Sequence, residues 1–213
     1  MNTLIFPKIV APLKFYAVVP NADWVIRMIN IGANTVQLRC KDLSGKALYD
    51  EITRCVKAIQ GRETQLFIND HWQAAIDAGA YGVHLGQEDL DTADLNAIHN
   101  AGLRLGISTH SDAELMRALA IKPSYVACGA IFPTTTKKMP TAPQGLERLR
   151  HYVKMAGKTP TVAIGGIDLS NAKDVLDCGV SSLAVVRAVT EAKNPEQVVK
   201  DFQKLWENNF QAA

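Results

Sequence analysis

The stretch Tyr125-Val-Ala-Cys-Gly-Ala-Ile-Phe-Pro-Thr-Thr-Thr-Lys-Lys-Met-Pro-Thr-Ala-Pro-Gln-Gly145 is the part of the sequence from which the fold is read. Its first residues form an apolar run that is typical of a buried strand, and a helical pattern begins just beyond it at Leu146. The connection between them is far longer than the ~2–6 residues usual in an α/β domain. It is rich in threonine, lysine and proline. Hydroxyls beside cations suit a phosphate, and the alternative is a solvated surface loop.

The same succession of a short apolar run and a helical pattern extends over the whole chain. The predicted strands are 15–19, 35–38, 65–68, 82–85, 104–107, 125–128, 161–164 and 182–186. The predicted helices are 23–31, 44–59, 74–78, 91–100, 113–120, 146–155, 170–176 and 195–210, and Ser44, Ser111 and Ser170 are the predicted caps of the second, fifth and seventh. Strict alternation favours a parallel sheet with crossover helices. The pattern therefore predicts an α/β fold, a single-domain (β/α)8 TIM barrel over residues 1–213 with 1–14 as an N-terminal extension.

Composition restricts the classes of partner. The net charge of +2 is too small to indicate nucleic acid or an anionic membrane. No run approaches the ~18 apolar residues of a transmembrane helix, and the first residues lack the apolar core of a signal peptide. The four cysteines form no CxxC pair, which favours a reduced, cytoplasmic setting. A monomer and a homo-oligomer both fit this composition.

Polar residues at the predicted strand ends mark the expected site, because the active site of a barrel lies at the C-terminal ends of its strands. Side-chain alternation after strand 35–38 directs Gln37, Arg39 and Lys41 to the barrel mouth and turns Cys40 away. The alternative is a solvated strand end with an ion pair to Asp42.

Carboxylates follow the third and fourth predicted strands. Asp70 and Asp89 are arranged as an Mg²⁺ site would require, since Mg²⁺ takes one or two carboxylates and leaves the other positions to water and phosphate. The alternative for each is the cap of the next helix.

The last two strands end in features that suit a phosphate. Gly165-Gly166 follows the seventh strand, where missing side chains would let an anion approach backbone N–H groups, although such a pair can also serve only as a turn. The eighth ends with Val186, and Arg187 comes directly after it. His84 is interpreted as a wall histidine, and the sequence shows no Ser/His/Asp or Cys/His nucleophile arrangement.

Together these segments resemble the thiamine-phosphate synthase family. The resemblance is carried, in order along nearly the whole chain, by the segments 37–42, 67–70, 82–89, 106–110, 129–138, 163–167 and 184–186. It implies a (β/α)8 barrel that joins 4-amino-2-methyl-5-hydroxymethylpyrimidine diphosphate to a thiazole phosphate with Mg²⁺ as cofactor, giving thiamine phosphate and diphosphate. The partners are then two small molecules.

The resemblance also implies roles for individual residues. The diphosphate substrate is expected on Gln37, Arg39, Lys41, Asn69, Ser108 and Lys137, of which Lys137, Arg39 and Ser108 are expected to be catalytic. Mg²⁺ is expected on Asp70 and Asp89. The thiazole phosphate is expected on Thr134, Thr136 and Gly166, with Val186 and Arg187 at the end of that site.

Two residues depart from the family pattern. Cys40 stands where an acidic residue is common, and Arg187 stands where the family usually has a serine of the thiazole-phosphate site. Arg187 would either bind phosphate with a longer reach or crowd the pocket. Two rival functions stay open. A thiazole tautomerase is an isomerase that resembles this family in sequence and fold, and a non-catalytic, phosphometabolite-binding regulatory barrel is kept open by Arg187.

Overall fold

The computed structural model describes residues 4–136 and 141–211, in which strands and helices alternate. The strands are β1 Lys14–Val19, β2 Thr35–Leu38, β3 Gln65–Asn69, β4 Gly82–Leu85, β5 Arg104–Thr109, β6 Tyr125–Cys128, β7 Thr161–Ile164 and β8 Ser182–Val185. The helices are α1 Ala22–Ile31, α2 Gly45–Ala58, α3 Trp72–Asp77, α4 Leu95–Asn100, α5 Asp112–Ala120, α6 Gly145–Ala156, α7 Ala172–Leu176, α8 Arg187–Thr190 and α9 Pro195–Gln211, with a 3₁₀ turn η1 at Asp89–Asp91.

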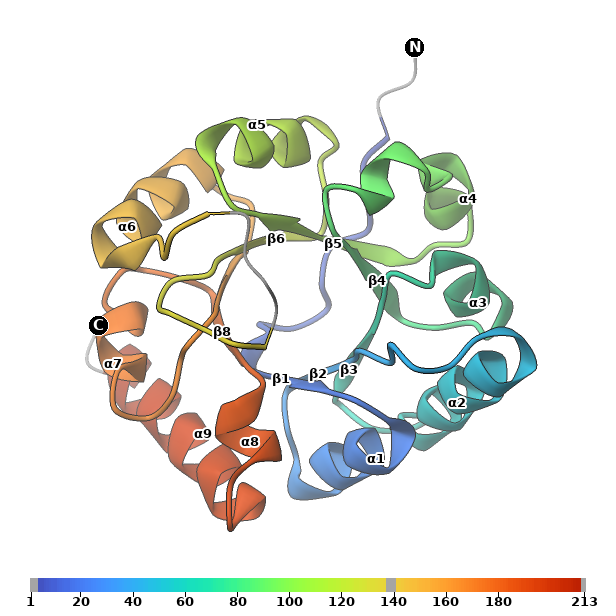
Figure 1. The fold of residues 1–213 in the computed structure, drawn as a ribbon, viewed down its shortest axis with the longest axis horizontal. Helices are drawn as coiled ribbons and strands as arrows, with labels where there is room; N and C mark the ends of the chain where they lie inside the picture. Colours follow the sequence, from blue (N-terminus) through green and yellow to red (C-terminus); the bar gives the residue numbers. More distant parts are fainter. Residues whose placement is uncertain (1–3, 137–140, 212–213) are drawn as a thin grey trace.

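The strands close into a parallel barrel in sequence order, and the helices form a ring around it (Figure 1). Closure is seen at β1, where Tyr16 pairs with Thr35 of β2 on one side and with Ala184 of β8 on the other. The predicted (β/α)8 barrel is therefore confirmed.

Two hydrophobic cores follow from side-chain alternation along the strands. On β1, Tyr16 and Val18 point into the barrel, whereas Phe15 and Val19 pack outward against the helices. The interior core is aromatic, and glycine on neighbouring strands makes room for it. A Cβ atom on Gly106 would lie only 2.1 Å from a ring carbon of Tyr125.

The N-terminal segment lies across the N-terminal ends of the strands. Leu13 is completely buried in the interior core, and the Phe6 side chain is buried as well. Ser124 donates a hydrogen bond to the Pro7 carbonyl, and Gln65 donates one to the Ala11 carbonyl. The segment covers this end of the barrel, so the functional cavity opens at the other.

Polar residues precede several helices, but only some of them cap the helix with a side-chain hydrogen bond. The predicted cap Ser111 is confirmed, since its hydroxyl accepts from the Glu114 N–H at the start of α5. Ser44 precedes α2 without a side-chain cap bond. The predicted cap Ser170 was wrong: Asn171 precedes α7, and the Ser170 hydroxyl bonds Asp168 instead.

Several predicted boundaries differ from the structure by one to four residues, and the largest difference is at α4. The predicted helix 91–100 begins only at Leu95, because the Asp94 side chain accepts from the Ala97 N–H and starts the helix there. The residues before it form η1 and a bend. The predicted last strand, 182–186, ends at Val185, and the short helix α8 that follows was not predicted.

Candidate active site

A cavity of about 700 Å³ opens at the C-terminal ends of the strands. Its volume lies in the range of small-molecule sites. Among the described residues, those predicted for the site all line it: Gln37, Arg39, Lys41, Asn69, Asp70, Asp89, Ser108, Thr134, Thr136, Gly166, Val186 and Arg187. Lys137 lies outside the described residues.

The end of β2 supplies the cations of one wall. Gln37 is buried, Arg39 is half-buried and Lys41 is exposed at the rim. Cys40 is buried in the outer core, which confirms that alternation turns it away. The alternative ion pair with Asp42 is not the one formed, because the Lys41 ammonium lies 2.5 Å from an Asp70 carboxylate oxygen.

Asp70 and Asp89 stand together at the ends of β3 and β4, close enough for each to shift the pKa of the other. Burial opposes ionisation of Asp70, but the Lys41 ammonium outweighs it and lowers the Asp70 pKa. Burial and the neighbouring Asp70 charge raise the pKa of Asp89. Neither carboxylate caps a helix, so the capping alternative was wrong: Asp89 accepts from the Gly86 N–H within its own loop.

The backbone of Asp70 is unusual. Its φ of 62° lies in the left-handed region that few residues other than glycine adopt. The Asp70 N–H donates to the His84 carbonyl, which ties the end of β3 to β4. Backbone strain of this kind is concentrated at functional sites, where it aims a side chain.

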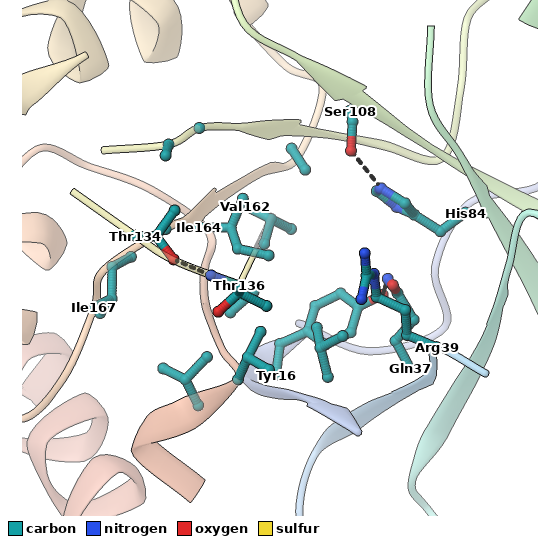
Figure 2. Close-up of a pocket in the computed structure, with 18 of the residues that line it drawn as sticks. Tyr16, Gln37, Arg39, His84, Ser108, Thr134, Thr136, Val162, Ile164 and Ile167 are labelled. Carbon is teal, nitrogen blue, oxygen red and sulfur yellow. Dashed lines mark hydrogen bonds between the residues drawn. The ribbon is translucent and has the colours of Figure 1, made fainter. Parts of the chain in front are cut away.

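The floor of the cavity is a hydrogen-bonded polar cluster. Tyr16 and Tyr125 hydroxyls lie 2.8 Å apart, and Gln37 donates to Tyr16. His84 lies 2.7 Å from the Tyr125 hydroxyl through Nδ1. Its Nε2 atom lies 2.7 Å from Ser108 Oγ (Figure 2). The interpretation of His84 as a wall histidine fits this arrangement. Sequence reasoning missed both tyrosines, although inward alternation on β1 and β6 was a signal that could have found them.

The long connection after β6 supplies the opposite wall. In Figure 2, Thr134 and Thr136 lie across the cavity from Gln37 and Arg39. The Thr136 N–H donates to the Thr134 hydroxyl at 3.3 Å. At the start of this connection, the N–H groups of Ile131 and Phe132 donate to the carbonyls of Ile164 and Gly165.

These backbone bonds explain the Gly165-Gly166 pair. A Cβ atom on Gly165 would lie 2.5 Å from the Ala130 Cβ atom, and one on Gly166 would lie 2.6 Å from the Pro133 carbonyl oxygen. Both residues also have positive φ angles. The pair is therefore required for close approach of two loops, a reason that the sequence interpretation did not include.

The end of β8 completes the rim. Val186 is half-buried, whereas Arg187 is exposed at the first position of α8. Among the described residues, Arg187 forms no ion pair. Arg187 lines the rim of the cavity, so whether it binds phosphate or crowds the pocket stays a prediction.

Comparison with known proteins agrees with this geometry. Residues 15–189 match the family model described as thiamine monophosphate synthase. A thiamine-phosphate synthase of Neisseria meningitidis serogroup B is 73% identical over 202 residues, which are 95% of this chain and 98% of that protein. The chain belongs to the thiamine-phosphate synthase family. As a member of this family it is a transferase of thiamine biosynthesis.

More distant members of the thiamine-phosphate synthase family agree over most of the chain. The protein of that name from Serratia proteamaculans is 54% identical over 187 residues, 88% of each chain. A solved structure described as thiamine phosphate pyrophosphorylase from Pyrococcus furiosus is 29% identical, with a TM-score of 0.82 over 93% of this chain and 97% of that one. The family resemblance read from the motifs is thus confirmed.

Proposed function

We propose that this protein condenses the aminopyrimidine diphosphate with a thiazole phosphate to give thiamine phosphate and diphosphate. The observation that carries the proposal is the division of one cavity into two walls. One wall holds cations and paired carboxylates, as a diphosphate with a divalent ion requires. The other holds threonine hydroxyls beside a glycine, as a monophosphate requires.

The diphosphate half is proposed at the ends of β2 to β5. Arg39 and Lys41 neutralise phosphate oxygens, and Asn69 and Ser108 offer neutral hydrogen bonds on the same side of the cavity. Lys137 is proposed to act on the same diphosphate from the connection after β6. As the carbon–oxygen bond breaks, charge develops on the leaving diphosphate, and these donors stabilise it.

Asp70 and Asp89 are proposed to hold Mg²⁺. Their fit rests on the donor set: two carboxylates lie together. Burial and the neighbouring Asp70 charge raise the pKa of Asp89, and a divalent cation would relieve the repulsion between the two charges. Mg²⁺ takes only one or two carboxylates and leaves its other positions to water and substrate phosphate. When bound, the ion would supply positive charge to the leaving diphosphate.

The thiazole phosphate is proposed to bind Thr134, Thr136 and Gly166, with Val186 and Arg187 at the end of the site. The loops after β7 and β8 are the usual phosphate site of such barrels. This placement orients the thiazole nitrogen toward the pyrimidine methylene carbon, and orientation of two reactants is itself a large part of catalysis.

A dissociative reaction needs no protein nucleophile, and the cysteines agree with that requirement. All four are unpaired and buried. Burial raises the pKa of Cys55 to about 12 and that of Cys128 to about 11, so neither forms a thiolate near neutral pH. The 4-amino group of the pyrimidine donates electrons to the methylene cation instead.

We also propose that the protein acts in the cytoplasm. Four unpaired cysteines fit a reducing compartment. Within the described residues, no helix combines the length and apolar character needed to cross a bilayer.

The test is to mix the purified protein with both substrates and Mg²⁺ and to measure thiamine phosphate and diphosphate. Equal amounts of both products, lost in excess chelator, support the proposal. A thiazole isomer formed without the pyrimidine substrate would identify a tautomerase. Binding of phosphates with no product of either kind would identify a non-catalytic barrel.

A further inference from the structure

A continuous row of hydrogen bonds crosses the floor of the cavity from β2 to β5. Gln37 Nε2 lies 2.9 Å from the Tyr16 hydroxyl, which lies 2.8 Å from the Tyr125 hydroxyl. Tyr125 lies 2.7 Å from His84 Nδ1, and His84 Nε2 lies 2.7 Å from Ser108 Oγ. The row joins two residues that are expected to touch substrate, Gln37 and Ser108, through three that are not.

The two tyrosines keep their protons. Both side chains are completely buried, and burial raises the pKa of each phenol well above its usual value. A neutral phenol has one hydrogen to donate and lone pairs to accept with. A tyrosine that accepts a hydrogen bond from one neighbour in the row therefore donates its own hydrogen to the other neighbour.

The direction is set at Gln37. Its Nε2 atom can only donate, so the Tyr16 oxygen accepts and the Tyr16 hydrogen points to Tyr125, the other recorded partner of this hydroxyl. Tyr125 then accepts from Tyr16 and donates to His84 Nδ1. A neutral imidazole that accepts at Nδ1 carries its hydrogen on Nε2, and this hydrogen points to Ser108.

We propose that Tyr16 and Tyr125 are positioning residues that hold His84 as the Nε2–H tautomer and thereby make Ser108 a hydrogen-bond donor to the substrate. The Ser108 oxygen accepts from His84, so its own hydrogen is available for a phosphate oxygen. At the other end, Gln37 donates a hydrogen bond from Nε2 to Tyr16, and its Oε1 atom can accept one from the substrate. This inference rests on the proposed function.

The two ends of the row then match the two ends of the aminopyrimidine diphosphate. Gln37 presents an acceptor, which suits the amino group of the ring. Ser108 presents a donor, which suits the diphosphate. With the opposite direction, Ser108 would donate to His84 and present only lone pairs to an anion, so the direction has a functional consequence.

The same direction prevents Ser108 from acting as a nucleophile. A serine is activated when a histidine nitrogen accepts its proton, as in the Ser-His-Asp arrangement. Here Nε2 carries a hydrogen, and the Tyr125 phenol contacts Nδ1. The Ser108–His84 pair is therefore a binding device within a dissociative reaction.

The first test measures the tautomer directly in the wild-type protein. The ¹⁵N chemical shifts of the two His84 ring nitrogens distinguish a protonated nitrogen from an unprotonated one. We expect His84 Nε2 to be protonated and Nδ1 unprotonated. A protonated Nδ1 would overturn the inference whether or not the protein makes thiamine phosphate, so this result is separate from failure of the proposed function.

The second test removes the middle of the row with Tyr125→Phe, which keeps the ring. We expect His84 to show a mixture of tautomers and kcat to fall roughly ten- to a hundredfold, as for loss of a hydrogen bond to a charged group. KM for the pyrimidine diphosphate should change less, because charge on the diphosphate grows in the transition state.

Tyr81→Phe is the matched control. The Tyr81 hydroxyl also makes two hydrogen bonds, to Gln65 and from the Val10 N–H, but it does not line the cavity. This variant should lose a similar amount of stability and keep its kcat. An equal fall of kcat in the two variants would show that loss of folded protein, and not the tautomer of His84, is responsible, and would overturn the inference.

A double-mutant cycle tests whether Tyr125 acts through Ser108. Ser108→Ala and the double variant Ser108→Ala/Tyr125→Phe should have the same kcat within about twofold, because the donor is already lost. If the decreases in kcat caused by the two single substitutions multiply in the double variant, Tyr125 acts independently of Ser108. That result would contradict the positioning role. If Tyr125→Phe does not fold, the wild-type ¹⁵N measurement still decides the question.

Discussion

The Lys41 ammonium nitrogen lies 2.5 Å from Asp70 Oδ2. A cation expected to bind diphosphate is thus paired with a carboxylate expected to bind the metal ion. Both partners have to exchange this contact for a new one when the diphosphate and Mg²⁺ bind. Binding of the two is therefore linked through a single ion pair.

Lys41→Met tests this link. Without the competing ammonium, the carboxylates should bind a divalent ion up to about fivefold more tightly in the free protein, the range of a half-exposed ion pair. KM for the pyrimidine diphosphate should rise. Mn²⁺ binding followed by electron paramagnetic resonance measures the first effect. Lys46→Met, which removes an ion pair on α2 outside the cavity, should change neither. Weaker Mn²⁺ binding in Lys41→Met would refute the competition.

Ionised Asp89 should lower the free energy of unfolding near neutral pH. Burial and the Asp70 charge raise its pKa, so an ionised Asp89 is less favourable in the folded protein than in the unfolded chain. The contribution of this group to stability therefore falls as pH rises through the raised pKa. Asp89→Asn should raise the melting temperature slightly at pH 7 in chelator and increase the Mg²⁺ concentration needed for activity. An unchanged Mg²⁺ requirement would exclude Asp89 as a ligand.

Asp70→Asn should lower the stability of the protein, in contrast to Asp89→Asn. The Lys41 ammonium lowers the Asp70 pKa despite burial, so the ionised form stabilises the fold above the usual aspartate range, and this stability is lost as pH falls through the lowered pKa. The variant should melt at a lower temperature than wild type at pH 7, and the difference should shrink in acid. Thermal unfolding between about pH 3 and pH 7 measures both effects.

Lys137→Ala should lose turnover much more than stability. A cation that neutralises charge on the leaving diphosphate acts mainly in the transition state, and removal of one such donor lowers kcat by about 10²–10³. Steady-state kinetics with thermal unfolding of the same sample separate the two effects. Comparable losses in both would argue against a catalytic role.

Arg187→Ser places the residue usual in the family at the start of α8. Because Arg187 is exposed at the rim and forms no ion pair with another described residue, we expect it to bind the thiazole phosphate. The variant should raise KM for that substrate roughly tenfold and leave KM for the pyrimidine diphosphate nearly unchanged. A lower KM for the thiazole phosphate would show instead that arginine obstructs the site.

Gly165→Ala should destabilise the protein and the second substrate site together. The added methyl group would meet the Ala130 Cβ atom, and φ is 105°. Overpacking of this kind costs about 1–3 kcal/mol. Gly102→Ala is the control, since its φ is also positive at 74° but nothing lies within 4 Å of the new atom. A larger loss in Gly102→Ala would contradict the packing explanation.

The barrel could be predicted because its signals are local and repeated. Apolar runs fix the strands, and alternation fixes which side chains face the mouth, as the opposite directions of Arg39 and Cys40 show. The same reasoning brought Asp70 and Asp89 together, since carboxyl ends of neighbouring parallel strands share one edge.

The features of the site that could not be predicted from the sequence depend on contacts between distant segments of the chain. The Tyr16–Tyr125 hydrogen bond joins residues 109 positions apart, and nothing local indicates it. The role of Gly165-Gly166 depends on how closely the connection after β6 approaches β7. The start of α4 depends on Asp94, whose side chain caps the helix at a position that the apolar pattern does not mark.

The bonds from Ile131 and Phe132 to the end of β7 also set a limit for engineering. Libraries that aim to admit other azole acceptors should leave 130–133 and Gly165-Gly166 untouched and diversify the connection only from Thr134 onward. Insertions there lengthen a loop whose first residues are already hydrogen-bonded to the end of β7. A substitution in 130–133 would need a compensating substitution in Gly165-Gly166, because the two segments are in close contact. Single-site mutagenesis would not find such pairs.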